Sequence, residues 1–367
     1  GSTDTQFDAY WFDASRISVA TSNDELGYYQ GSRSNDSLSN LHLNGSQIGQ
    51  SLVTNTKGVP DGNVYIFGVN QIGSNNFSDR ESRFSTIGFG LTEAEMVDDN
   101  ATIQAYQTAL GRRVDADAQA VIDYINGTDA TLTTAQETAI TNLVVSYKSN
   151  GLWDKRKAIY GVIGGTADSH ATNFKDPRDL DAAFRLAYIG YGVTHSSNGM
   201  NGNYTGGANS FINILTEFGS PNIFSAGYYS RTSSNSNTVE MGTSAGGVRM
   251  HLVIGYGSST TAEFDCYDES ATRVTGANGT ETGWFLGSRL STTDSKLFKD
   301  GSQIGSLATT MSASPPNANL TVMGSGTGAY GTRECAFAVI GDGLTTAEQL
   351  IEYDIIQAYQ TELGRQI

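Results

Sequence analysis

The sequence predicts a mainly β protein built from two similar sandwich units, and three observations support this prediction. First, the 367 residues include 43 glycines, whereas only 16% of the residues are charged. Second, short apolar runs alternate with clusters of Gly, Ser, Thr and Asn, which is typical of many short strands joined by tight turns. Third, one stretch of the chain occurs twice, and this repeat defines the two units.

The repeat is clearest at the end of each unit. Residues 103–112 and 356–365 differ at a single position, Ala109 against Glu362, and the offset between them is 356 − 103 = 253 residues. We therefore expect the two units to share one fold. Shorter motifs repeat upstream, namely GSQIG at 45–49 and 301–305, GYYQGSR at 27–33 against GWFLGSR at 283–289, and FDAY at 7–10 against FDCY at 264–267.

Each copy of the terminal stretch has the pattern of an amphipathic helix that follows a strand. Thr92 with Glu95, and Thr345 with Glu348, are predicted to form capping boxes, in which the paired side chains satisfy backbone N–H groups at a helix start. Each helix should cross its sandwich and bury its apolar side chains, at about 1.5–3 kcal/mol for each large one. In the first unit these side chains are Ile103, Tyr106 and Leu110.

Strand patterns occupy both units. No such pattern precedes Phe7, so we expect the sequence to begin inside its first domain. The expected strands of the first unit lie within residues 7–19, at 28–29, at 41–48, at 64–69 and at 84–89. Those of the second unit that precede its repeated half lie at 225–230, 239–242 and 247–255.

Helical patterns separate the two units. Residues 116–126 and 133–149 carry apolar residues at helical spacing, and Thr134 with Glu137 is the expected capping box of the second helix. Residues 194–208 are predicted to form a polar, Gly-rich loop, and 211–217 a short helix or an edge strand. The predicted domains are a first sandwich at residues 1–113, truncated at its N-terminus, a helical linker or insertion at 114–175, and a second sandwich at 176–367.

The charge balance excludes one class of partner. The chain has 38 acidic residues against 22 Lys and Arg, a net charge of −16, whereas nucleic-acid binding needs clustered cations. No apolar run approaches the ~18 residues of a membrane span. Cys266 and Cys335 both lie in the second unit, where the first has Ala9 and Ser82, so we expect two buried thiols and not a disulfide.

Catalytic motifs are missing from the sequence, with one partial exception. No HExxH, Cys-x-x-Cys or G-x-S-x-G pattern occurs, so a metal hydrolase or a Ser-triad enzyme lacks its motif. In the stretch EFDCYDE, strand alternation would place Glu263, Asp265 and Tyr267 on one face. The stretch resembles the Glu-x-Asp-x-(x)-Glu motif of laminarinase-type glycosidases, which use paired carboxylates. Its third acid, Asp268 or Glu269, is out of register, so we expect no enzyme activity.

Adjacent aromatic residues are the candidates for glycan binding. Tyr28 with Tyr29, and Trp284 with Phe285, occupy equivalent places in the two units, and one member of each pair should face outward from its strand. An outward ring could stack on a sugar, or it could pack against a cross-strand neighbour. Acidic loops such as Asp98-Asp99 and Asp294 could hold Ca²⁺, but the spacing of the acidic residues is not that of a Ca²⁺ motif, so no cofactor is expected.

Two motifs carry a resemblance to known proteins. Both units end in the pattern LT-x-A-E…IQAYQT-x-LGR, at residues 91–112 and 344–365, and on this pattern they resemble laminin-G/concanavalin A-like jelly-roll modules. Residues 151–186 contain the string KDPRDLDAAFRL. This segment is similar to one in tail and fibre proteins of phages that infect Bacteroidetes, crAss-like phages included, where it precedes a jelly-roll unit.

The resemblance covers nearly the whole chain and transfers no catalytic residue. It implies tandem concanavalin A/laminin-G-like jelly-roll sandwiches and a virion or extracellular location. The expected function is that of a structural or adhesive module of a phage tail fibre. Its expected partners are other fibre subunits, in a homotrimer for example, and a host surface polysaccharide. Two alternatives stay open: a secreted carbohydrate-active enzyme or its carbohydrate-binding module, and a bacterial surface adhesin.

Overall fold

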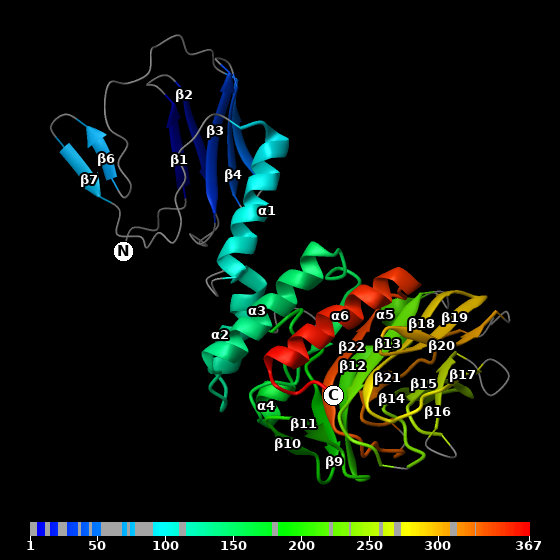
Figure 1. The fold of residues 1–367 in the computed structure, drawn as a ribbon. Coiled ribbons are helices and arrows are strands. Elements are labelled where there is room, and N and C mark those ends of the chain that lie inside the picture. The colour runs from blue at the N-terminus through cyan, green and yellow to red at the C-terminus, as the bar shows by residue number, and fades with distance from the viewer. Residues whose placement is uncertain are drawn as a thin grey trace. The chain divides into compact units, whose positions relative to one another are not determined.

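The computed structural model divides the chain into two compact units, Gly1–Val114 and Asp115–Ile367 (Figure 1). The residues that the structure describes are 6–11, 15–20, 28–35, 38–43, 46–52, 68–71, 74–77, 91–109, 115–177, 183–219, 223–234, 236–256, 260–267, 273–308, 314–326 and 328–367.

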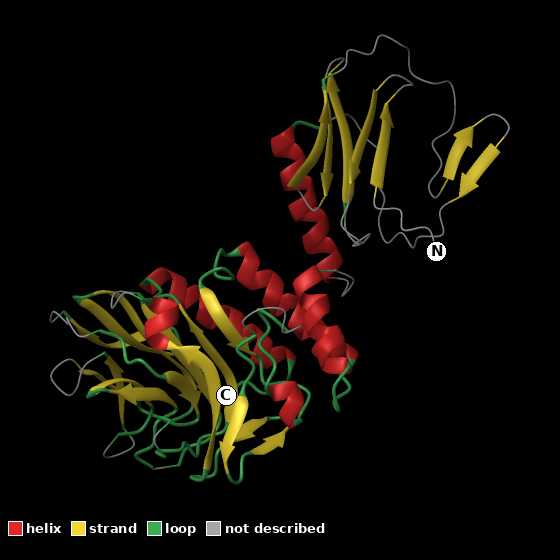
Figure 2. Ribbon diagram, turned by 180° about the vertical axis from the view of Figure 1, so that it is seen from behind, coloured by secondary structure: helices red, strands yellow, loops and turns green. Residues whose placement is uncertain are grey.

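The second unit is a sandwich of two antiparallel sheets with helices packed on one side (Figure 2). One sheet has the order β10-β11-β22-β13-β18-β19-β20, with β8 also paired to β22. Its strands are β8 (Arg156–Tyr160), β10 (Thr194–Ser196), β11 (Gly199–Asn201), β13 (Phe224–Ser230), β18 (Gly283–Ser291), β19 (Asp294–Lys299), β20 (Ser302–Leu307) and β22 (Cys335–Gly341).

The other sheet has the order β17-β16-β15-β14-β21-β12-β9. Its strands are β9 (Ala187–Gly190), β12 (Gly206–Asn213), β14 (Met241–Ala245), β15 (Val248–Val253), β16 (Thr261–Cys266), β17 (Arg273–Ala277) and β21 (Asn319–Val322). The helices of the unit are α2 (Ala116–Asn126), α3 (Thr134–Ser149), α4 (Ala167–His170), α5 (Ile214–Phe218) and α6 (Thr346–Glu362).

Two hydrophobic cores lie on opposite faces of the β13-containing sheet. Tyr228 and Phe285 belong to the core between the two sheets, whereas Tyr229 and Trp284 belong to the core beneath the helices. Because neighbouring residues of a strand point to opposite faces, each aromatic pair supplies one ring to each core. This sheet is therefore covered on both faces, which explains why every residue of β13 and β22 is buried.

A buried ion pair joins the helical segment to the terminal helix. The Arg156 guanidinium donates to both carboxylate oxygens of Glu352, at 2.7 and 2.5 Å, and the Tyr147 hydroxyl donates to the same carboxylate at 2.9 Å. The side chains of Arg156 and Glu352 are 0% exposed. Together with the pairing of β8 to β22, this contact makes residues 115–175 part of the core of the second unit.

Within its described residues, the first unit contains the sheet β3-β4-β5, two hairpins and one helix. Its elements are β1 (Gln6–Trp11), β2 (Ser15–Ala20), β3 (Tyr29–Asn35), β4 (Leu38–Leu43), β5 (Ser46–Ser51), β6 (Gly68–Gln71), β7 (Ser74–Phe77) and α1 (Glu93–Ala109). The predicted strand at 84–89 and most of that at 64–69 lie outside the described residues.

The described parts of the two units confirm the repeat. Strands β3-β4-β5 and β18-β19-β20 pair in the same register at an offset of 285 − 29 = 256 residues, including the bulges at equivalent positions. Ser32 exchanges two hydrogen bonds with the backbone of Leu91, at 2.6 and 2.5 Å. Ser288 does the same with Leu344, at 2.8 Å each. One serine thus fixes the start of the terminal helix to the sheet in both units.

The terminal helices confirm their predicted caps but only part of their predicted burial. Both capping boxes are present, at Thr92 with Glu95 and at Thr345 with Glu348. Ile103 is buried, as predicted, and Leu110 lies outside the described residues. Tyr106 is 49% exposed, so its predicted burial was wrong.

The repeat explains the difference at Tyr106. Tyr359, the equivalent residue of α6, is 2% exposed and donates a hydrogen bond to the Gly161 carbonyl at 3.1 Å. Gly161 also lies against Phe174, so a segment that follows β8 covers this tyrosine. Residues 1–90, which precede the first copy of the terminal helix, contain no sequence similar to this covering segment.

Smaller corrections concern single elements. The capping box of α3 is formed by Thr133 and Gln136, one residue earlier than predicted. The expected loop at 194–208 contains β10, β11 and the start of β12, and the stretch at 211–217 ends β12 and then forms α5. Cys266 and Cys335 are free and buried, as predicted, and burial raises the pKa of each thiol to about 12. Among the helices that the structure describes, none is long and apolar enough to cross a membrane.

Candidate functional site

Trp284 and Phe285, two of the four predicted glycan-binding residues, are fully buried. Trp284 packs edge-on against Phe337 beneath the helices, with 6.2 Å between ring centroids, and Phe285 lies between the sheets. Both are 0% exposed, so neither offers a ring face to a sugar. The prediction was wrong for these two residues, because the helices cover the strand face that alternation identified as outward.

Tyr28 and Tyr29 are partly buried in the first unit. The Tyr28 hydroxyl donates to the Asp99 carboxylate at 3.1 Å, and the Gln30 amide donates to the same oxygen at 2.7 Å. Asp99 occupies the repeat position of Glu352, since 352 − 253 = 99. Tyr28 therefore links the sheet to α1, and glycan binding by Tyr28 and Tyr29 stays a prediction.

The carboxylates of Glu263 and Asp265 are held by arginines, while Asp268 and Glu269 lie outside the described residues. The Arg273 guanidinium lies 2.8 Å from Glu263 and 2.9 Å from Asp265, and Arg249 lies 2.9 Å from the other Asp265 oxygen. Burial raises the pKa of Glu263. Glu263 and Asp265 share a face, as predicted, but Tyr267 does not. β16 ends at Cys266, and Tyr267 takes a φ of 76° and enters the core.

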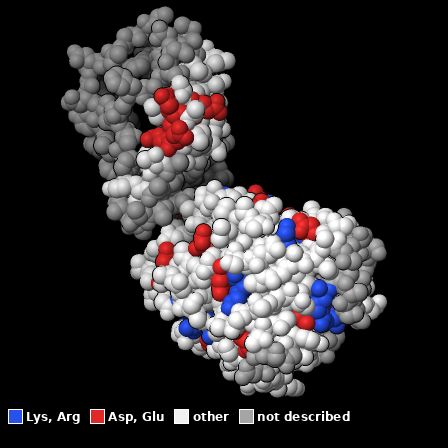
Figure 3. All heavy atoms as spheres, turned by 45° about the vertical axis from the view of Figure 1, so that its right-hand side comes forward, with Lys and Arg blue, Asp and Glu red and all other residues white. Residues whose placement is uncertain are grey.

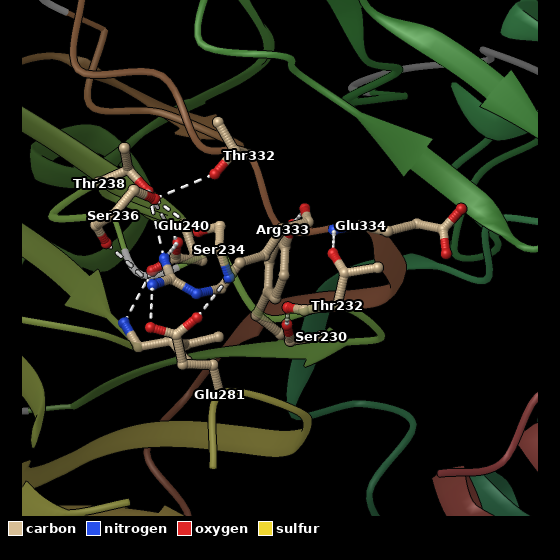
Figure 4. Close-up of polar contacts among 12 residues, drawn as sticks. Ser230, Thr232, Ser234, Ser236, Thr238, Glu240, Glu281, Thr332, Arg333 and Glu334 are labelled. Atoms are coloured by element: carbon tan, nitrogen blue, oxygen red, sulfur yellow. Dashed lines mark hydrogen bonds and ion pairs between the residues drawn. The ribbon is translucent and has the colours of Figure 1, made fainter. Parts of the chain in front are cut away.

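A second ionic cluster surrounds Arg333 (Figure 4). Its guanidinium donates to Glu240 at 2.5 Å and to Glu281 at 2.8 Å, and all three side chains are almost completely buried. Glu281 also accepts from the Ser234 backbone N–H, and Glu240 from that of Ile254. Burial raises the pKa of Glu240, while the nearby Arg333 lowers it.

The Arg333 cluster holds the irregular chain between β13 and β14 in place. Hydroxyl side chains recur there at every second position, and they bond to one another and to Thr332. This alternation was visible in the sequence as Ser230, Thr232, Ser234, Ser236 and Thr238. Because the described polar atoms of the cluster mostly bond to one another, we assign it a structural role.

Three exposed aromatic side chains lie in β12 or beside its start, and the sequence predictions missed them. Tyr191 is 89% exposed, Tyr204 56% and Phe211 52%. They are three of the five large aromatic side chains that are exposed among the described residues. We call these three residues, together with Asn203 and Asn209, the aromatic edge.

Backbone geometry fixes the first part of the aromatic edge. The Tyr191 N–H donates to the Thr205 carbonyl at 2.9 Å, and the Thr205 hydroxyl donates back to the Tyr191 carbonyl. Asn203 and Tyr204 have φ values of 48° and 61°. A left-handed backbone is uncommon for asparagine and a clear outlier for a bulky residue such as tyrosine. Such outliers cluster at ligand clamps and other functional sites.

The second part of the aromatic edge is a bulge in β12. The pairing of β12 with β21 shifts register between Asn209 and Asn213, and Phe211 there has a φ of 59°. The Asn209 side chain accepts from the Phe211 N–H at 2.8 Å, and Asn213 donates to Asn317 at 3.0 Å. The bulge thus presents an aromatic ring to solvent among amide side chains.

The sequence did contain a signal for this surface. Residues 187–216 include no Asp, Glu, Lys or Arg, although the chain as a whole carries a net charge of −16. These 30 residues (216 − 187 + 1) carry no Asp, Glu, Lys or Arg and yet include exposed side chains. We therefore expect a binding partner of this surface that is not an ion.

A histidine pair joins β10 and α4. The Nδ1 atoms of His170 and His195 are 3.1 Å apart, and the Gly165 N–H donates to His170 Nε2 at 3.2 Å. His170 therefore carries its proton on Nδ1 and donates it to His195. Burial, assisted by His195, lowers the pKa of His170 to about 3.

Acid is expected to destabilise the second unit through two histidines, His170 and His251. Burial also lowers the pKa of His251, to about 4, so below pH 6.5 the unfolded chain binds protons that the folded chain does not. Stability is retained above pH 6.5 and lost as the pH falls toward 3. Each of the two should cost about 2.7 kcal/mol between pH 7.5 and 4.5.

The variant His170→Gln, whose amide can still accept from Gly165, isolates this effect. Urea unfolding at several pH values should show an acid-induced loss smaller by about 2.7 kcal/mol than in the parent chain. Equal losses in the two proteins would contradict the assignment.

The described residues contain no group of three or more His, Cys, Asp or Glu side chains placed to hold a metal ion. No protein-family model matches the chain, and no curated protein matches it either.

Several solved structures are similar to the chain at low identity. Domain 4 of AbnA, a GH43 extracellular arabinanase from Geobacillus stearothermophilus, in complex with arabinotriose, matches at 12% identity with a TM-score of 0.39, over 54% of this chain and 98% of that one. A mutant of Trypanosoma rangeli sialidase that displays trans-sialidase activity matches at 11% identity and a TM-score of 0.39, over 60% of this chain and 40% of that one.

Botulinum neurotoxin type C, from a study of its interaction with two ganglioside molecules, matches at 10% identity and a TM-score of 0.40, over 57% of this chain and 53% of that one. The chain thus spans about half or less of the sialidase and toxin chains. Similarity at this level supports no argument about function, so the proposal below depends on the residues themselves.

Proposed function

We propose that the second unit binds saccharides at the aromatic edge, without catalysis, as part of a structural and adhesive protein. The observation that carries this proposal is that Tyr191, Tyr204 and Phe211 are all exposed within one uncharged stretch of the sequence, residues 187–216. Exposed aromatic rings supply large contact area at a low entropic cost, because they rotate about only two side-chain bonds.

The chemistry of the aromatic edge suits a sugar. An aromatic ring can pack against the C–H face of a pyranose, while the amides of Asn203 and Asn209 both donate and accept hydrogen bonds, as sugar hydroxyls do. The left-handed backbone at Asn203, Tyr204 and Phe211 is held by hydrogen bonds within the strand and its turns. A site that is ordered before binding loses less entropy when the ligand arrives.

Two observations support binding without hydrolysis. Glu263 and Asp265 both contact Arg273, and Glu240 and Glu281 both contact Arg333. A glycosidase needs one carboxyl group that protonates the leaving group and a second that acts as a nucleophile or a base. An arginine that bridges two carboxylates occupies oxygens that such a reaction would use.

We propose that the protein belongs to a tail fibre or a similar virion-surface appendage. There it contacts other fibre subunits and a host surface polysaccharide. The repeat and the resemblance of residues 151–186 to fibre proteins support this proposal. Immunogold labelling of this protein on purified virus particles would test the proposal. Absence of label from the appendages would contradict it.

Binding should depend on the tyrosines of the aromatic edge. We expect the double variant Tyr191→Ala, Tyr204→Asn to weaken the binding of array-identified glycans roughly thirtyfold, since each lost anchor costs about 1 kcal/mol or more. Asparagine at 204 tolerates the left-handed backbone. Titration calorimetry on the full chain measures the change in Kd.

The matched control for this experiment is Tyr256→Ala. Tyr256 is also an exposed tyrosine, at 41%, but it lies outside the uncharged stretch, and the Arg273 guanidinium packs over its ring. This control should bind as the parent chain does. An equal loss in the control, or an unchanged Kd in the double variant, would refute the assignment of the site. An array without any signal would leave only the structural role.

A further inference from the structure

We infer that the ligand of the aromatic edge is an uncharged, chain-like saccharide of several sugar units. This inference rests on the proposed function and adds two properties to it, the absence of charge and the length. Each property comes from a separate observation on the described residues, so each can fail without the other.

The first observation is that residues 187–216 include no Lys or Arg. Recognition of a carboxylate or sulfate sugar normally uses Arg or Lys, with Arg favoured for paired hydrogen bonds. The uncharged stretch offers neither, and its only titratable cation, His195, has a pKa lowered by burial. The overall charge of −16 also repels acidic polymers.

The charged residues that border the stretch are engaged elsewhere. Arg185 donates to the Pro177 carbonyl at 2.8 Å and lies over the Tyr124 ring at 4.4 Å. Glu217 accepts from Lys157 at 3.3 Å. On the face of the second unit shown in Figure 3, Lys and Arg side chains lie beside Asp and Glu and form no large basic patch. An acidic sugar would therefore meet no spare cation in the uncharged stretch or at its two ends.

The amides of the aromatic edge complete this argument. Neutral hydroxyl groups both donate and accept hydrogen bonds, and an asparagine amide can match either role. Binding through such groups and aromatic rings does not depend on the release of counterions, so its affinity should change little with ionic strength.

The second observation is the spacing of the aromatic residues along β12. Tyr191 and Tyr204 stand at adjoining turns before β12 begins at Gly206, whereas Phe211 is five residues further along the strand. At 3.3 Å for each residue, the part of the strand from Gly206 to Phe211 alone spans roughly 17 Å. A single sugar can contact one end, while a linear oligosaccharide can contact both.

The experiment uses the full chain and neutral oligosaccharides with lengths from disaccharide to hexasaccharide, taken from mannan, xylan and β-glucan. Alginate and polygalacturonate fragments of the same lengths serve as acidic probes. We expect the neutral hexasaccharide of at least one series to bind about tenfold more tightly than its disaccharide, equally at low and high salt. In Phe211→Asn, which keeps the left-handed position acceptable, this gain with length should disappear while disaccharide binding persists.

The outcomes separate the two levels of the proposal. Tighter binding of the acidic probes, weakened by salt, would overturn the absence of charge while leaving saccharide binding in place. A parent chain that binds hexasaccharide and disaccharide equally would overturn the chain-like ligand, and a gain with length that survives in Phe211→Asn would overturn the role of Phe211 in contacting its far end. Failure of every glycan, acidic and neutral, to bind would overturn the proposed function and this inference together. Tyr256→Ala, with unchanged binding, again controls for non-specific surface effects.

Discussion

Glu352→Ala is expected to lower the free energy of unfolding of the second unit by about 3–5 kcal/mol, because it leaves the Arg156 guanidinium buried without its partner. Both side chains are 0% exposed, and Arg156 reaches Glu352 with two hydrogen bonds. The Tyr147 hydroxyl loses its acceptor in the same variant. Three elements meet at this carboxylate, so α6 should separate from α3 and β8 at lower urea concentration.

Urea unfolding, monitored by tryptophan fluorescence, measures this loss of stability. Two control variants test whether the unpaired buried charge causes it. Replacing both partners, Arg156→Met with Glu352→Leu, should recover most of the loss, since it is the unpaired buried charge that costs most. Asp99→Ala changes the equivalent position of the first unit, where the carboxylate accepts from the neutral groups of Tyr28 and Gln30. It should leave the unfolding of the second unit unchanged. A loss below 1 kcal/mol in Glu352→Ala would show that the pair is not needed for the packing of α6.

Arg333→Ala is the second substitution with a large expected effect, again about 3–5 kcal/mol. It leaves two carboxylates, Glu240 at 0% and Glu281 at 2% exposure, without the cation that lies between them (Figure 4). The chain from 231 to 239 should then lose its anchor to β22 and become sensitive to proteolysis.

The pH dependence of Arg333→Ala distinguishes this mechanism from a simple packing defect. Burial already raises the pKa of Glu240, and loss of Arg333 should raise it further above its value in the unfolded chain. The folded variant then binds more protons than the unfolded one, so its stability rises as the pH falls through that raised pKa. Its deficit against the parent chain should therefore be smaller at pH 4.5 than at pH 7.5.

The neighbouring arginine provides the matched control for Arg333→Ala. Arg231 pairs with Glu334 at 3.3 Å, and both side chains are 19% exposed. Arg231→Ala should cost less than about 1 kcal/mol and show no rescue in acid, because water can solvate the carboxylate that remains. A deficit of Arg333→Ala that is the same at both pH values would contradict the buried-charge explanation.

Features that depend on neighbours in the sequence were predicted well. The duplicated unit, the capping boxes at Thr92 and Thr345, and the helices α2 and α3 follow from short patterns that act through local hydrogen bonds and side-chain spacing. The shared face of Glu263 and Asp265 also followed from alternation alone. In each case the relevant contacts lie within a few residues, or repeat with a fixed period, so the sequence carries the information directly.

Features that depend on what covers a surface were decided by the tertiary structure. Alternation identified the two faces at Trp284 and Phe285, but it could not show that helices from residues 115–149 and 346–362 would cover the outer one. Packing against the segment that follows β8 buries Tyr359, whereas Tyr106, the equivalent residue of the first unit, is half exposed. The bulge at Phe211 arises where β12 pairs with the distant strand β21, which is why this part of the aromatic edge became visible only in the folded chain. Local patterns thus determined which elements form, and burial was decided by non-local packing.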